Sequence, residues 1–472
     1  MSGVAKNEPS RGVISTNKDG VGQIYAWDRD TGGMTVKTNS PAGKGGGTLS
    51  KDGEWIFYHQ DDKPGLEIGH YVAIRWDASA GPGDTVDLTP QLKSYAASGL
   101  VEAKDGSKLV LSAAVDGGQV IYVKDGGIDA PPVEYHRIDQ LVQTGMLVLS
   151  PCGRYLAQSS NEHTLPDVAM DAALNIYDLT LPAGSAPIAT LWDGPKTSMS
   201  SYSFVPEHEP LQMVVTSSAS GFDRPFMWEP LSGTRTELPS LSAIEGQLTP
   251  VCFDEAGTKL LVRQNHHAQV SLHMLDVASG SVSSMPEQPK GLFSSGFFDK
   301  LTGDLCVGFA NEATPAMVIT LDATTGAPKE ALLPAGSITP PPGSSSCAAA
   351  ADSSSSDPRS FESITFPSEN GDMVQGWLAL PAEESDGPWP TILHTHGGPT
   401  SIQMQSYNPA AQAWLDAGFA WCSVNYHGST ECVAQFFRPR VHWFRSCGCC
   451  GCCGCCCCCG CGLIPAAAPS FW

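Results

Sequence analysis

The sequence predicts a β-propeller with seven four-stranded blades, followed by the first part of an α/β domain. Three observations lead to this fold class. A short strand that ends in an acidic residue recurs about every 49 residues, a length typical of propeller blades. A glycine turn recurs between these strands. After a Pro-, Ser- and Ala-rich stretch, the repeat gives way to a strand, loop, helix, strand pattern, which is the opening of an α/β sheet.

The first repeated signal is a short apolar strand that ends in Asp or Glu, usually with a glycine soon after it. Its first copy is Tyr25–Asp28 with Gly32, and its last is Ile319–Asp322 with Gly326. The copies end at Asp28, Asp77, Asp125, Asp178, Glu229, Asp276 and Asp322. Seven copies over residues 12–334 predict seven blades.

The second repeated signal is a tight turn that precedes another apolar strand. Asp52-Gly53 stands before Trp55–Tyr58, and Asp105-Gly106 stands before Leu109–Leu111. Glycine supplies the positive φ angle that such hairpin turns need. Two hairpins in each repeat give four strands, which is one blade. An irregular array of β-sandwiches is the alternative interpretation.

Composition and charge limit the function classes. The chain has 472 residues, 49 of them glycine and 36 proline, which favours turns and short strands. Its net charge of −22 argues against nucleic acid or an anionic membrane surface as a partner. We see no secretory signal and no run of about 18 apolar residues, so we expect a cytoplasmic protein that does not enter a membrane. No cofactor is predicted, and the oligomeric state stays open.

A change of composition at residues 335–360 divides the chain. This stretch contains Pro340–Gly343, Ala348–Ala351 and Ser353–Ser356, and it cannot bury enough apolar surface to order itself. We interpret it as a linker. The predicted organisation is a tail at 1–11, a propeller at 12–334, a linker at 335–360, a partial α/β domain at 361–430 and a Cys/Gly-rich tail at 431–472.

Two strands and a turn open the α/β domain. Phe361–Phe366 and Val374–Pro381 predict a hairpin, with its turn at Asn370-Gly371. Trp389–Thr395 is apolar along most of its length and predicts a buried strand.

A helix and a further strand follow. Pro409–Ala417 predicts a helix, with Asn408 as its N-cap and proline at its first position. Gly418 is suited to the C-terminal end of this helix. Phe419–Asn425 predicts a second buried strand. Strand, helix and strand in this order form a crossover unit.

A glycine loop after the strand Trp389–Thr395 is the candidate site. It reads His396, Gly397, Gly398, Pro399. Serine hydrolases of the α/β class build half of an oxyanion hole from such a loop. Glycine lets the backbone approach the substrate closely, and losing one N–H donor costs about 3 kcal/mol of transition-state stabilisation. The alternative for the histidine is simple packing at the end of the strand, and it is not assigned as a catalytic base.

The segment 361–430 resembles the prolyl oligopeptidase family of serine peptidases, most closely its acylaminoacyl-peptidase and dipeptidyl-peptidase branch. The residues that carry the resemblance are Asn370-Gly371, Gln375–Leu378, His396–Thr400 and Val424–Thr430. The last of these is similar to the family's Asn-Tyr-Arg-Gly-Ser-Thr, with His427 in place of arginine. A propeller followed by a hydrolase domain is also the family's order.

The resemblance implies an α/β-hydrolase domain that cleaves short peptides through an acyl-enzyme, with the propeller as a cap that excludes large folded substrates. It implies that Gly398 would give one oxyanion-hole N–H, while His396 and Gly397 would shape the loop. A short peptide is therefore the expected partner. Neither a metal nor a cofactor belongs to this chemistry.

The catalytic triad is missing from the sequence. No serine has glycine both two residues before it and two residues after it, as the nucleophile elbow Gly-x-Ser-x-Gly requires. In the family, the serine, aspartate and histidine would all follow Thr430. We therefore expect a chain that is truncated in its hydrolase domain and inactive. The alternative function is a non-enzymatic propeller that binds peptides or proteins.

The last stretch of the chain is rich in cysteine. Of 17 cysteines, all lie between Cys447 and Cys461 except Cys152, Cys252, Cys306, Cys347, Cys422 and Cys432. Metal-binding cysteines come as spaced pairs, and the run Cys455–Cys459 cannot face one ion. A lipidated cluster would need a neighbouring apolar helix. The preferred interpretation is an aberrant, disordered tail read from a wrong frame or an intron, and a thiolate metal site and a lipidated cluster are the alternatives.

Overall fold

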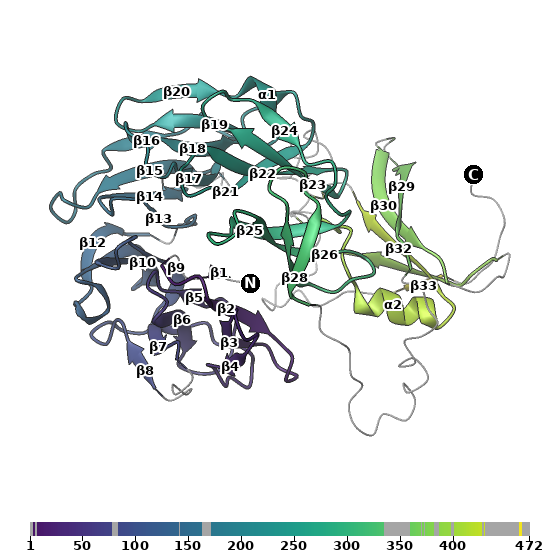
Figure 1. Ribbon diagram of the computed structural model, residues 1–472, viewed down its shortest axis with the longest axis horizontal. Coiled ribbons are helices and arrows are strands. Elements are labelled where there is room, and N and C mark those ends of the chain that lie inside the picture. Colours follow the sequence, from purple (N-terminus) through teal and green to yellow (C-terminus); the bar gives the residue numbers. More distant parts are fainter. Residues whose placement is uncertain are drawn as a thin grey trace.

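Strands are the main regular secondary structure of the residues that the structure describes. The structure is a computed structural model, and the residues it describes are 3–4, 7–77, 84–140, 142–162, 171–334, 359–369, 371, 373–381, 387–397, 401–426, 429 and 462–464. Figure 1 shows a ring of small sheets with a further sheet and a helix beside it. The helical elements in the described residues are η1 (Gly127–Asp129), α1 (Pro239–Ser242) and α2 (Pro409–Asp416).

Up to Leu333, the described strands form seven four-stranded antiparallel sheets that follow one another along the chain. Their strands are β1 (Gly3–Val4), β2 (Arg11–Thr16), β3 (Gln23–Asp28), β4 (Met34–Val36); β5 (Thr48–Leu49), β6 (Trp55–Asp61), β7 (Gly69–Arg75), β8 (Thr85–Asp87); β9 (Ala96–Glu102), β10 (Lys108–Val115), β11 (Gly118–Asp125), β12 (Val133–Ile138); β13 (Val148–Leu149), β14 (Tyr155–Ser160), β15 (Ala173–Asp178), β16 (Ala189–Leu191); β17 (Met199–Phe204), β18 (Met213–Ser217), β19 (Arg224–Glu229), β20 (Thr234–Glu237); β21 (Gln247–Phe253), β22 (Lys259–His266), β23 (Gln269–Asp276), β24 (Val282–Ser284); β25 (Leu292–Phe298), β26 (Leu305–Ala310), β27 (Met317–Leu321) and β28 (Pro328–Leu333).

Both repeated signals of the sequence have a fixed place in these sheets. The acidic residues of the first signal mark the ends of the third strands, from β3 to β27. β7 and β27 end at Arg75 and Leu321, just before Asp77 and Asp322, and the other third strands end in the acidic residue itself. The glycine turns lie between the first and second strands. Their glycines have positive φ angles, 78° at Gly53, 73° at Gly106, 69° at Gly153 and 69° at Gly257. The turn chemistry inferred from the sequence is confirmed, because only glycine adopts these angles without a steric cost.

The sheets are arranged around a common centre (Figure 1). First strands of successive sheets contact one another, as in β1 with β5, β9 with β13, β13 with β17, β17 with β21, and β21 with β25. The apolar core lies between neighbouring sheets. One cluster joins Leu261 and Leu272 of the sheet β21–β24 to Leu305 and Val307 of the sheet β25–β28. This arrangement is consistent with a β-propeller.

Side chains join the last sheet to the first. Arg29, after β3, forms an ion pair with Asp299, after β25, and the Nη1 to Oδ1 distance is 3.0 Å. The Asp299 side chain is only 1% exposed. Beside this pair, Trp27 packs with Leu332 and Leu333 of β28. The described residues show no strand shared between the first and last sheets, so this seam is held by side chains.

The sheet beside the ring consists of β29 (Glu362–Pro367), β30 (Met373–Ala379), β31 (Thr391–Thr395), β32 (Ala420–Asn425) and β33 (Gly462–Ile464), in the order β29-β30-β32-β31-β33. We call this sheet and α2 the α/β unit. β31 and β32 are parallel and α2 connects them. The Asn408 side chain accepts hydrogen bonds from the N–H groups of Ala410 and Ala411, which confirms its prediction as N-cap.

One expectation for this unit was wrong. The strand predicted at Trp389–Thr395 begins at Thr391 and is not buried on both faces. Ile392 is 1% exposed, but Leu393 is 37% exposed. The reason is that α2, Trp421 and the neighbouring ring pack on the face that carries Ile392, while the described residues leave the opposite face partly open.

Three residues of the predicted tail, Gly462–Ile464, pair with β31 in antiparallel fashion. The rest of the tail lies outside the described residues, and for those residues disorder stays a prediction. The linker at 335–360 also lies outside them, apart from its last two residues. Among the helices of the described residues, none is both long and apolar enough to span a membrane.

The hairpin of β22 and β23 joins the ring to the α/β unit. Its two turn residues, His267 and Ala268, both have positive φ angles, 52° and 61°. Ala268 is fully buried in a cluster that includes Trp377 and Ile392 of the α/β unit. Beside it, the Asn265 amide lies 3.6 Å from the Met404 sulfur. The turn therefore sits in a backbone conformation that is unusual for these residues, and contacts with the second unit surround it.

Candidate active site

The candidate site lies at the edge where β31 and β32 end. Because these strands are parallel, their carboxyl ends meet at the same edge, which is where open α/β sheets carry their ligands. His396 is the first residue after β31, and Tyr426 and Ser429 follow β32. The structure thus brings together two segments that lie about thirty residues apart in the sequence.

His396 is held by two residues from the second segment. Its Nε2 atom is 2.8 Å from the Ser429 hydroxyl oxygen, and its ring stacks on Tyr426 with 4.5 Å between the ring centres. The Tyr426 hydroxyl donates to the His396 carbonyl at 2.9 Å. Ser429 donates its own hydrogen to the Tyr426 carbonyl at 2.7 Å. The Ser429 hydroxyl therefore lies between the His396 ring and the Tyr426 carbonyl and contacts both.

The predicted oxyanion-hole loop is described only in part. His396 and Gly397 belong to the described residues, whereas Gly398 and Pro399 lie outside them. In the described part of the chain, no atom lies within 4 Å of the position that the Cβ of a side chain at Gly397 would take. The role of Gly398 as an oxyanion-hole donor stays a prediction.

A second anchor holds the chain beyond this loop, at Gln403. The Asn425 side chain accepts from the Gln403 N–H at 2.6 Å and donates to its carbonyl at 3.0 Å. The Trp377 indole N–H donates to the same carbonyl at 2.9 Å. Gln375 accepts from the Asn425 amide at 2.5 Å. The segment after β31 is therefore fixed at both ends, since His396 is held on one side and Gln403 on the other.

These anchoring residues were missed as functional residues from the sequence. Gln375, Trp377 and Asn425 are all at most 3% exposed, and they lie on neighbouring strands. They belong to two of the segments that carry the family resemblance, but nothing in the sequence showed that they bind one loop. One sequence signal could have pointed to them. Gln375 and Asn425 carry amide side chains within otherwise apolar strands, and a buried amide needs hydrogen-bond partners.

His394 lies on β31, two residues before His396. Its ring stacks on Trp421 with 5.1 Å between the ring centres. Burial lowers the pKa of His394, and the neighbouring His396 lowers it further. The side chain is therefore neutral at pH 7 and packs as an aromatic group at the end of the strand. In the described part of the chain, no cluster of His, Cys, Asp and Glu side chains could hold a metal ion.

Replacing Asn425 by Ala should destabilise the α/β unit by about 2–4 kcal/mol, because the Gln403 N–H and the Gln375 carbonyl would stay buried without partners. Hydrogen exchange should rise in residues 401–408. Ser423→Ala is the matched control, since Ser423 is also 1% exposed on β32 and its hydroxyl has no partner among the described residues. We expect that control to stay within about 1 kcal/mol of the wild type. Equal losses of stability in the two variants would show that Asn425 does not anchor this segment.

Solved structures with the same fold are hydrolases. A prolyl endopeptidase aligns with 92% of this chain and 62% of its own, at a TM-score of 0.69 and 16% identity. Puromycin hydrolase aligns with 92% of this chain and 67% of its own, at a TM-score of 0.65 and 16% identity. A variant of that enzyme complexed with PGG covers 90% of this chain and 66% of its own, with a TM-score of 0.64 and 17% identity.

At these identities the likeness shows a shared fold. Among curated proteins, an uncharacterised peptidase of Bacillus subtilis (strain 168), YuxL, is 38% identical over 69 residues. That match covers 14% of this chain and 10% of YuxL. The chain therefore spans about two thirds of the solved structures and matches only a short part of the curated relative. No protein-family model matches the chain.

Proposed function

We propose that this chain represents a serine-type peptidase of the prolyl oligopeptidase family, in its acylaminoacyl-peptidase and dipeptidyl-peptidase branch, which acts on short peptides. The observation that carries the proposal is the His396 contact with Ser429 and Tyr426 at the edge shared by β31 and β32. An oxyanion hole needs N–H donors that are fixed before negative charge develops, and a glycine loop anchored at this edge can supply them. The shared fold with a prolyl endopeptidase supports the same reaction class.

The proposal gives each part of the chain a role. The seven sheets would be seven blades that cap the site. The first sheet includes β1, so the propeller predicted at 12–334 would begin within the stretch predicted as a tail at 1–11. The stretch 335–360 would be a linker, and 361–430 would be the first part of an α/β-hydrolase domain. The N–H of Gly398 would stabilise the oxyanion. His396, Gly397 and Pro399 would shape the loop around it. The ligand would be a short peptide, comparable to the PGG that is bound in the structure of the puromycin hydrolase variant.

The 472-residue chain itself is proposed to be inactive, because it contains no Gly-x-Ser-x-Gly segment. Ser429 lies beside His396, but its features do not suit a nucleophile. It is 2% exposed, and its hydroxyl donates to the Tyr426 carbonyl.

The test uses the purified chain with acyl-amino-acid and dipeptidyl chromogenic substrates. We expect no turnover above that of a heat-denatured sample and no covalent labelling by a serine-directed fluorophosphonate. Turnover that the fluorophosphonate abolishes would show that an unrecognised serine performs the reaction. Ser429→Ala would then identify whether it is this serine.

The second candidate is a propeller that binds peptides without cleaving them, and the missing nucleophile elbow favours it. Sequencing of transcripts across the codons for Thr430 to Cys447 separates the two candidates. An open frame that continues to a Gly-x-Ser-x-Gly segment supports the peptidase. A transcript that encodes the cysteine tail supports the binding protein.

A further inference from the structure

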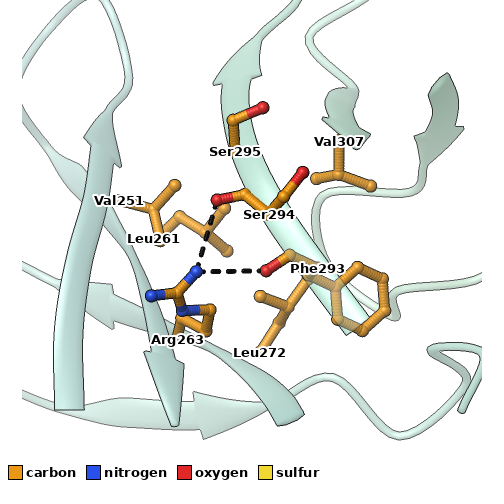
Figure 2. A pocket seen from close by; sticks show the side chains of 8 residues that line it. All are labelled: Val251, Leu261, Arg263, Leu272, Phe293, Ser294, Ser295 and Val307. Carbon is orange, nitrogen blue, oxygen red and sulfur yellow. Dashed lines mark hydrogen bonds between the residues drawn. The ribbon is translucent and has the colours of Figure 1, made fainter. Parts of the chain in front are cut away.

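A small pocket lies between the sheets β21–β24 and β25–β28 (Figure 2). Its lining consists of Val251, Leu261, Arg263, Leu272, Phe293, Ser294, Ser295 and Val307. Five of these residues are apolar, and Arg263 is the only one with a charged side chain. A guanidinium group among apolar walls is poorly screened by water, which strengthens its attraction for an anion.

Arg263 has no carboxylate partner among the described residues. Its Nη1 donates to the carbonyl oxygens of Phe293 and Ser294 at 3.2 and 3.3 Å, as Figure 2 shows. Both bonds use one nitrogen, and they are long for a charged donor. By contrast, Arg154 and Arg235 each hold a carboxylate at 2.6 to 2.9 Å. An arginine without an ion pair is unexpected in a chain with 49 acidic and 27 basic residues.

The opposite wall of the pocket is shaped by an irregularity in β25. The pairing of β25 with β26 shifts register between Phe293 and Gly296, and Ser294 and Ser295 are exposed there. A Cβ atom on Gly308 would lie 2.4 Å from the Ser294 hydroxyl, so glycine is needed at 308 for this side chain to fit. Such bulges redirect side chains and are frequent near binding sites.

The pocket lies close to a contact between the ring and the α/β unit. Arg263 lies on β22, two residues before Asn265, which contacts Met404. Met404 follows Gln403, the residue that Asn425 holds. The pocket is partly open to solvent, and the space inside it is about 10 Å³, enough for a group the size of one water. An oxygen of a carboxylate is of that size, whereas a whole peptide residue is not.

We propose that Arg263 binds the carboxylate of a short peptide ligand, with Nε and Nη2, which have no partner among the described residues, as donors. The planar fork of arginine fits a carboxylate, which can accept two parallel hydrogen bonds. The choice of a peptide as the ligand rests on the proposed function, but the binding itself requires no hydrolysis. The carboxylate can be the C-terminus of the peptide or an acidic side chain.

The test is fluorescence anisotropy with the full 472-residue chain and three labelled alanine tetrapeptides. One has a free C-terminus, the second is amidated, and the third is amidated and contains one glutamate. We expect the free peptide to bind at least about tenfold more tightly than the amidated one, and added salt to reduce this preference. If the glutamate restores binding, the site accepts a side-chain carboxylate, and if it does not, the site reads the C-terminus. Both outcomes support a carboxylate site.

Three variants assign the preference to Arg263. Arg263→Gln should bind the free and amidated peptides equally, and Arg263→Lys, which keeps the charge without the fork, should fall between this variant and the wild type. Arg137→Gln removes an exposed arginine on β12 and should bind like the wild type. Thermal unfolding checks that each variant is folded. Equal binding of the two peptides by the wild type, or a preference that survives in Arg263→Gln, would overturn the proposal, whatever the separate substrate assay shows.

Discussion

Arg29→Met is expected to destabilise the ring of sheets by about 3–5 kcal/mol, because it leaves the Asp299 carboxylate buried without its cation. Burial raises the pKa of Asp299, but the Arg29 hydrogen bond and the Leu301 N–H outweigh burial and lower it overall. A lowered pKa means that this stabilisation is present at neutral pH and is lost as the pH falls through the folded-state pKa. Chemical unfolding followed by circular dichroism, at neutral and acidic pH, measures both effects.

Two controls separate this seam from surface electrostatics. Arg137→Met breaks a pair with Glu134 in which both side chains are about a third or more exposed, and it should cost at most about 1 kcal/mol. Arg29→Met combined with Asp299→Leu removes both charges and should recover most of the stability. If Arg29→Met costs no more than Arg137→Met, the ion pair does not hold the ring closed.

Ala268→Asp is expected to separate the α/β unit from the ring, since a carboxylate would replace a methyl group that is fully buried. Its neighbours Phe361, Trp377 and Ile392 carry no positive charge that could pair with the carboxylate, so the loss should reach about 3–5 kcal/mol. Hydrogen exchange should increase in α2 and β31, while the seven sheets keep their protection. Limited proteolysis should then release a fragment that ends near residue 334.

Two variants test whether the site of the charge matters. Ala219→Asp places the same charge in the exposed loop between β18 and β19, and it should leave the α/β unit protected. Ala268→Gly should stay within about 1 kcal/mol of the wild type, because glycine adopts the φ angle of 61° without strain. Unchanged protection in Ala268→Asp would show that the hairpin does not join the two parts.

Local chemistry explains what the sequence could predict. Turn glycines such as Gly53 and Gly106 fix a backbone angle by themselves, and Asn408 caps its helix through atoms two and three residues away. The sheet pattern of the ring follows from these local signals and their repeat. The crossover of β31, α2 and β32 also follows, although β31 is shorter and more exposed than expected.

Contacts between distant segments explain what the sequence could not predict. The bond from Asn425 to Gln375 spans 50 positions, and it depends on the register of β30 against β32. His267 and Ala268 are not residues that indicate a turn with positive φ, and tertiary contacts hold them there. Nothing in the sequence distinguishes Arg263 from other strand residues. Its place in a pocket depends on packing against the neighbouring sheet β25–β28. The glycine loop could be predicted from its own residues, whereas the residues that anchor it could be identified only from the structure.

The parallel pairing of β31 and β32 also bears on the order of folding. The hairpin of β29 and β30 can form early, because its partners lie close together along the chain. His396 and Ser429 are 33 positions apart, and they can meet only after the chain between them, including α2, has closed the crossover. We therefore expect this contact to form in a late kinetic step. Until then, a newly synthesised chain would expose the glycine loop, together with the unpaired edge of β30, to other nascent chains.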